Sequence, residues 1–80
     1  GMDTTASLTR LQSAVKAAPQ SAILFLLLGD VHQLGENFAG ADAAYRRAMV
    51  LAPRWAKPQI NLGLLRLAQN KPAEATVLFE

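Results

Sequence analysis

The 80-residue chain contains no cysteine, which excludes disulfide bonds and thiolate metal sites. Its longest apolar run, AILFLLL at residues 22–28, is far shorter than the ~20 residues that cross a bilayer. The first residues, GMDTTAS, lack the basic and apolar regions of a secretory signal. The net charge is only +2, with the basic residues spread along the chain. We therefore expect a cytoplasmic protein with no membrane and no nucleic-acid partner.

The residues that are present predict one small all-α domain. Apolar residues make up 51% of the chain and charged residues 18%, which is typical of a globular protein and too apolar for a disordered one. No segment alternates like a strand, and apolar residues recur at helical spacing. The spacing predicts about five helices, at roughly 5–17, 22–34, 38–51, 56–69 and from Pro72 onward. The loops between them are short, so consecutive helices should be antiparallel neighbours.

Several residues mark the helix boundaries. Ser21 and Asn37 are expected to cap the N-termini of the second and third helices, because their side-chain oxygens can accept backbone N–H groups. Pro53 should end the third helix. Pro58 falls in the first turn of the fourth helix, where a missing N–H costs little.

A 34-residue period relates the two halves of the chain. Shifting the sequence by 34 places Leu28-Gly29 on Leu62-Gly63, and it places Pro19 on Pro53. The same shift aligns Ala41 with Ala75 and Tyr45 with Phe79. A glycine inside a helix costs ~1 kcal/mol relative to alanine, so its recurrence in phase indicates that it allows close helix packing. A period of this length is typical of helical repeat proteins.

These positions resemble the tetratricopeptide repeat, whose pattern is W-x2-L-G-x2-Y, A-x3-F and P over 34 residues. One copy reads Phe25-x2-Leu28-Gly29-x2-His32, then Ala41-x3-Tyr45 and Pro53. The resemblance implies one domain over residues 1–80, with the second half of a repeat at 5–19, a complete repeat at 22–55 and an incomplete one at 56–80. The sequence departs from the pattern at His32, Gln59, Arg66 and Pro72. The implied fold is a right-handed superhelix of antiparallel helix hairpins.

The resemblance also implies a concave groove, lined by the first helix of each copy. The groove residues are expected to be Ile23, Leu26, Asp30, Gln33, Leu34, Lys57, Ile60, Asn61, Leu64, Leu67 and Ala68. This mostly apolar set favours an apolar helix or peptide of a partner protein. Some family members bind a C-terminal carboxylate, but Asp30 would repel one. The alternative is that further repeats or a second copy of the chain cover these residues.

We expect no catalytic, cofactor-binding or metal-binding residue and no enzyme activity in this chain. His32 is the only histidine and occupies a packing position, which favours a structural role. Asp42 and Glu74 are explained by the positive N-terminal ends of their helices. Trp55 is expected to pack at a hairpin junction, and Arg46-Arg47 to form a solvated face.

Three functions remain open at this point. The first is a scaffold module that binds a protein partner in the groove. The second is an accessory segment of a larger bacterial enzyme, for example a transferase, with its catalytic domain beyond Glu80. EATVLFE at the C-terminus lies inside a helical pattern without a cap, so we expect the natural chain to continue or to have been cut there. The third is self-association into a dimer or higher oligomer, because small repeat stacks without polar end caps expose apolar surface.

Overall fold

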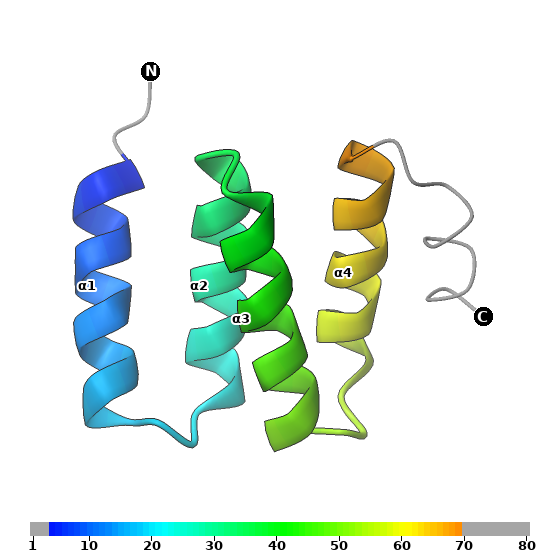
Figure 1. Ribbon diagram of the computed structural model, residues 1–80. Coiled ribbons are helices and arrows are strands. Elements are labelled where there is room, and N and C mark those ends of the chain that lie inside the picture. Colours follow the sequence, from blue (N-terminus) through cyan, green and yellow to red (C-terminus); the bar gives the residue numbers. More distant parts are fainter. Residues whose placement is uncertain (1–3, 70–80) are drawn as a thin grey trace.

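The computed structural model of the protein describes residues 4–69, and every regular element in that range is an α-helix (Figure 1). The helices are α1 (Thr4–Ala17), α2 (Ala22–Leu34), α3 (Phe38–Leu51) and α4 (Ala56–Ala68). Each predicted range is correct to within one residue at either end. The predicted fifth helix lies outside the described residues. Within residues 4–69, no helix has the length and hydrophobicity that a bilayer-crossing segment needs.

Two of the helices begin at the predicted capping residues. The Ser21 side chain accepts a hydrogen bond from the Leu24 N–H at 3.3 Å, and Asn37 Oδ1 accepts one from the Gly40 N–H at 3.0 Å. Both predictions are thereby confirmed. Pro58 is buried in the first turn of α4, where its backbone nitrogen would have no partner within the helix. Local side-chain and backbone chemistry therefore sets these boundaries.

The turn between α2 and α3 is tight and contains one residue in the left-handed region. Glu36 has a φ of 61°, whereas the preceding Gly35 has a φ of −86°. The turn is closed by backbone hydrogen bonds from the Glu36 N–H to the Gln33 carbonyl and from the Asn37 N–H to the His32 carbonyl. The conformation that favours glycine is thus adopted by a glutamate.

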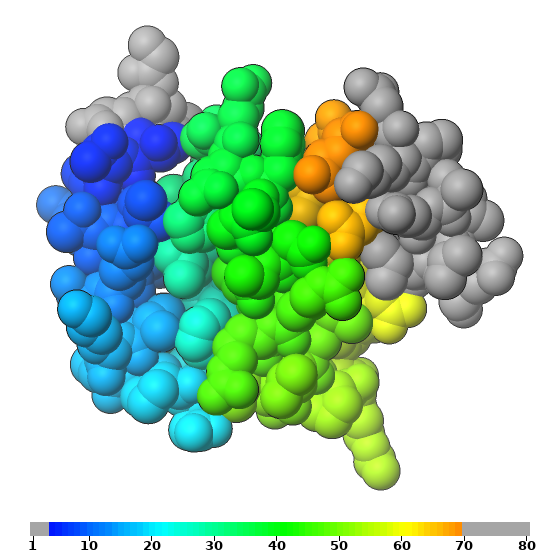
Figure 2. All heavy atoms as spheres, viewed as in Figure 1, coloured from blue at the N-terminus to red at the C-terminus, as the bar shows by residue number. Residues whose placement is uncertain are grey.

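The helices pack in chain order. Helix α1 lies against α2, α2 against α3, and α3 against α4, and consecutive helices run in opposite directions (Figure 1). In the space-filling view, α3 occupies the middle of the visible face between α1 and α4 (Figure 2). Because the loops are short, each helix packs against the next helix in the chain.

The core is formed by α2, α3 and α4 together. Its buried cluster consists of Leu26, Ala41, Tyr45, Leu62 and Leu65, and Phe38, Met49 and Trp55 pack against it. The packing role predicted for Trp55 is confirmed. Helix α1 contributes no buried residue. Since burying a leucine side chain stabilises a fold by about 1.5–3 kcal/mol, α1 gains the least from packing among the four helices.

Helix α2 lies very close to α3 where Gly29 meets Tyr45. A Cβ atom on Gly29 would lie 2.5 Å from Tyr45 Cε1 and 2.6 Å from Cδ1, which is closer than real Cβ contacts allow. Tyr45 and Ala41 are both fully buried. The close-packing role predicted for Gly29 is therefore confirmed, and the tyrosine ring fills the space that a side chain at position 29 would need.

A candidate partner-binding face on α2 and α4

A cluster of polar side chains joins α2, α3 and α4 around Asp30. The Tyr45 hydroxyl donates to Asp30 Oδ1 at 2.5 Å, and Gln33 Oε1 lies 3.1 Å from the same hydroxyl as a second acceptor. Asn61 Nδ2 of α4 donates to Asp30 Oδ1 at 3.1 Å. Asp30, Gln33 and Asn61 were all predicted to face one groove, and these bonds bring them together across two helices.

The tyrosine reaches this cluster from inside the core. Its ring is buried against Gly29, and its hydroxyl, which is also buried, lies beside the Asp30 carboxylate. Burial, and then the hydrogen bond and negative charge of Asp30, raise the pKa of the Tyr45 hydroxyl well above its usual value of 10. The sequence identified Tyr45 only as the counterpart of Phe79 in the repeat pattern. No local pattern could show that its hydroxyl reaches residues 12 and 15 positions earlier.

Large apolar side chains remain exposed on either side of the polar cluster. On α2, Ile23 is 60% exposed and Leu34 is 64% exposed. On α4, the exposed fractions of Ile60, Leu64 and Leu67 are 47%, 49% and 45%. All five belong to the predicted groove. We define the α2/α4 face by these residues together with Asp30, Gln33, Lys57 and Asn61.

One predicted groove residue lies elsewhere. Leu26 is only 4% exposed and belongs to the buried cluster with Leu62 and Leu65. It packs in the core, so it cannot offer its side chain to a partner. The physical reason is that Leu26 belongs to the cluster that α2 forms with Ala41 and Tyr45 of α3 and with Leu62 and Leu65 of α4. In its place the structure exposes Leu27, which is 43% exposed and which the sequence did not single out.

Two shallow hollows flank Asp30. The larger, of about 610 Å3, is lined by Asp30, Gln33, Leu34, Glu36, Phe38 and Ala68. Ala68 of α4 and three predicted groove residues of α2 therefore share one depression. The smaller, of about 330 Å3, is lined by Ser7, Arg10, Leu11, Leu27, Asp30 and Val31, and lies between α1 and α2. Asp30 is the residue that the two hollows have in common.

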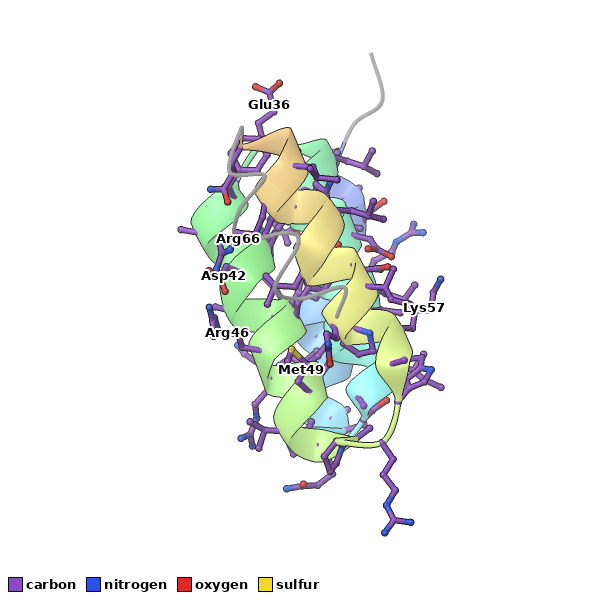
Figure 3. The ribbon with its side chains drawn as sticks, turned by 90° about the vertical axis from the view of Figure 1, so that its right-hand side faces the viewer. Glu36, Asp42, Arg46, Met49, Lys57 and Arg66 are labelled. Atoms are coloured by element: carbon purple, nitrogen blue, oxygen red, sulfur yellow. The ribbon has the colours of Figure 1, made fainter. Side chains whose placement is uncertain are left out.

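A separate group of charges fixes α3 to α4 away from this face. Arg66 donates to Asp42 Oδ2 at 2.8 Å, and Arg46 donates to Asp42 Oδ1 at 2.5 Å. Figure 3 shows these three side chains together along one edge, with Lys57 projecting from the opposite side of α4. Partial burial acts to raise the pKa of Asp42, but the hydrogen bonds and charges of the two arginines outweigh it, so this pKa lies below its usual 3.8.

This arrangement corrects the sequence-based interpretation of Asp42. The residue is the fifth of α3 and lies outside the first turn of the helix, so the helix dipole does not explain it. Its partner Arg66 is 24 positions away, and the Arg66 side chain is only 11% exposed. Arg46 is 61% exposed although it is paired with Asp42, and Arg47 is also exposed, so both fit the solvated role expected for them.

His32 has a structural contact in the α2–α3 turn. Its Nδ1 lies 3.2 Å from Asn37 Nδ2, which donates to it when the imidazole carries its proton on Nε2. The same Asn37 side chain caps α3. Among residues 4–69, no group of three or more histidine, aspartate or glutamate side chains is arranged to hold a metal ion.

Comparisons with known proteins add no assignment. No protein-family model matches the chain, and no curated protein has a significantly similar sequence. Conclusions about function therefore depend on the geometry of the α2/α4 face.

Proposed function

We propose that this protein is a binding module of the tetratricopeptide type, whose α2/α4 face holds an apolar helix or peptide of a partner protein. Three features support the repeat interpretation. Gly29 lies so close to the Tyr45 ring that a Cβ atom would not fit, Ala41 is fully buried at the small position of the repeat pattern, and Ala48 is fully buried on the same helix. In a stack of such hairpins, α2 and α4 would form neighbouring inner helices of a right-handed superhelix. Binding, rather than catalysis, is the activity that we assign to the face.

The exposed apolar side chains of α2 and α4 carry the proposal. Five of the seven large hydrophobic residues that are exposed in the described part of the chain belong to the α2/α4 face. Several large apolar side chains exposed on one face are typical of interaction sites on globular proteins. On α4, Ile60, Leu64 and Leu67 recur at intervals of four and three residues, and on α2, Ile23 and Leu34 are eleven residues apart, which is about three helical turns. The two helices are joined by the Asp30–Asn61 hydrogen bond. A partner helix laid along them would bury its own apolar face.

The test is a selection of helical peptides from an unbiased display library on the purified protein. The affinity of the best peptide is then measured for Leu64→Glu and Val50→Glu. Leu64 is 49% exposed on the proposed face, whereas Val50 is 69% exposed on α3 and serves as the matched control. We expect at least a tenfold loss of affinity for the first variant and no change for the second. Equal effects of the two substitutions would contradict the proposal.

The same surface could instead be covered by a second copy of the chain. Its apolar character suits a homodimer interface as well as a partner helix. Light scattering across a concentration series distinguishes the two cases. A dimer that Leu64→Glu dissociates and Val50→Glu leaves intact would assign the face to self-association. If the protein is a monomer at every concentration, a second copy does not cover the α2/α4 face, and the result favours a different partner.

A further inference from the structure

Asp30 is a carboxylate without an ion pair in the middle of an apolar face. It is half-buried and lines both hollows. In the described part of the chain, the ion pairs all involve Asp42, and none involves Asp30. Arg10 lines the smaller hollow with Asp30 but forms no ion pair with it. The donors that Asp30 does have, Tyr45 and Asn61, are both neutral, so its negative charge is hydrogen-bonded but has no positive partner.

The hydrogen bonds to Asp30 account for only one of its two oxygens. The Tyr45 hydroxyl and Asn61 Nδ2 both donate to Oδ1. These two donors also fix the orientation of the carboxylate, because one comes from a fully buried ring and the other from the neighbouring helix α4. A carboxylate can accept about four hydrogen bonds, and the two bonds to Oδ1 leave Oδ2 available to a ligand.

Exposed apolar residues flank Asp30 and Asn61 along their helices. Along α2, Leu27 precedes Asp30 by three positions and Leu34 follows it by four, and both are exposed. On α4, the exposed Ile60 and Leu64 flank Asn61, the donor to Asp30. A ligand that covers this area must therefore be apolar at both ends of the contact. At its centre it must present a group that a carboxylate attracts.

We propose that the partner segment carries one lysine or arginine that pairs with Asp30 Oδ2, with apolar residues three or four positions before and after it. This inference rests on the proposed function and deepens it by specifying the chemistry of the partner. The pair would lie in a partly desolvated site, where charged hydrogen bonds are stronger than at an open surface. An acidic residue at the same position of a competing segment would be repelled, so Asp30 also provides specificity.

The probe is the peptide selected on the wild-type protein, compared with two versions in which the central basic residue becomes norleucine or glutamate. We expect about a tenfold loss of affinity with norleucine and a larger loss with glutamate. Asp30→Asn keeps an oxygen that can accept from Tyr45 and Asn61 but removes the charge. On this variant the lysine and norleucine peptides should bind equally well.

The outcomes separate the two proposals. Suppose first that the selected peptides bind Leu64→Glu more weakly than the wild-type protein. The proposed face then stands, but the inference about Asp30 is wrong if these peptides carry no basic residue or bind equally well when norleucine replaces it. If their binding ignores Leu64→Glu, or if no peptide is recovered, both proposals fail. Should Asp30→Asn fail to fold, the peptide series on the wild-type protein decides alone. Its lysine peptide must then weaken with added salt, and the norleucine peptide must not.

Discussion

Replacing Gly29 by alanine tests the close approach of α2 and α3 directly. The new Cβ would lie 2.5 Å from Tyr45 Cε1 and 3.0 Å from Cζ, so it would overlap the ring over much of one edge. The ring cannot move freely, because it is fully buried and its hydroxyl is held by Asp30. Either the two helices separate or the tyrosine leaves its position.

Two opposing effects set the size of the change. Helix propensity alone favours alanine over glycine by ~1 kcal/mol inside a helix. Overpacking a core costs about 1–3 kcal/mol. If the ring moves away from Asp30, the loss of a hydrogen bond to a charged group adds about 1.5–3 kcal/mol. Overpacking alone leaves a net cost of about 0–2 kcal/mol, and weakening of the hydrogen bond adds to it, so we expect Gly29→Ala to lower the free energy of unfolding by about 1–3 kcal/mol.

The measurement is denaturant and thermal unfolding followed by far-ultraviolet circular dichroism. For a domain of this size, the expected loss corresponds to a fall in melting temperature of roughly 5–20 °C. Gly35→Ala is the matched control. That residue has a φ of −86°, and the nearest atom to a new Cβ is Thr4 Oγ1 at 3.3 Å. Its stability should change by no more than about 0.5 kcal/mol.

A second background isolates the cause. In Tyr45→Leu the ring is absent, so adding Gly29→Ala should be neutral or stabilising there, although it is destabilising in the wild type. If Gly29→Ala in the wild-type background instead raises stability by the ~1 kcal/mol that propensity predicts, the contact between Gly29 and Tyr45 does not have the energetic role assigned to it.

Two further changes probe the centre of the molecule and the α2–α3 turn. Tyr45 is the only tyrosine, and burial and Asp30 raise the pKa of its hydroxyl above 10. The protonated hydroxyl therefore stabilises the folded state fully below pH 10, and this stabilisation is lost as the pH rises toward the pKa of the folded state. In an alkaline titration, the absorbance of tyrosinate should therefore rise only when the circular dichroism shows unfolding. If Tyr45 ionises near pH 10 while the circular dichroism stays that of the folded protein, the prediction is wrong. Glu36→Gly should stabilise the fold by up to about 1 kcal/mol in urea titrations, because Glu36 has a φ of 61°; a loss of stability would show that this conformation carries no strain.

Local chemistry made the helices predictable. Ser21 and Asn37 each satisfy an N–H three residues ahead, which depends on no other part of the chain. The sequence also predicted the location of the α2–α3 turn, but not its backbone geometry. Gly35 is the residue that suits a left-handed conformation, yet Glu36 adopts it, because the backbone bonds from residues 36 and 37 to the end of α2 fix where the chain reverses.

The direction of each α2 side chain was harder to predict. Residues 22–28 are all apolar, so the sequence marks no polar side that would show which way the helix faces. The resemblance to the repeat family placed Leu26 in the groove, and no polar residue nearby argued against it, but the structure buries Leu26 and leaves Leu27 exposed. On α4, where polar residues interrupt the pattern, the assignments of Ile60 and Leu64 to the exposed side agree with the structure.

The sequence by itself determined where the four helices begin and end, and that Gly29 serves a close contact, because those properties depend on capping, helical period and side-chain size. Only the tertiary structure decided which charges pair and which hydroxyl meets which carboxylate. Asp42 meets Arg66 across 24 positions, and Asp30 meets Asn61 across 31. Such contacts arise from the packing of helices against one another, and no residue near either partner in the chain carries a signal of it.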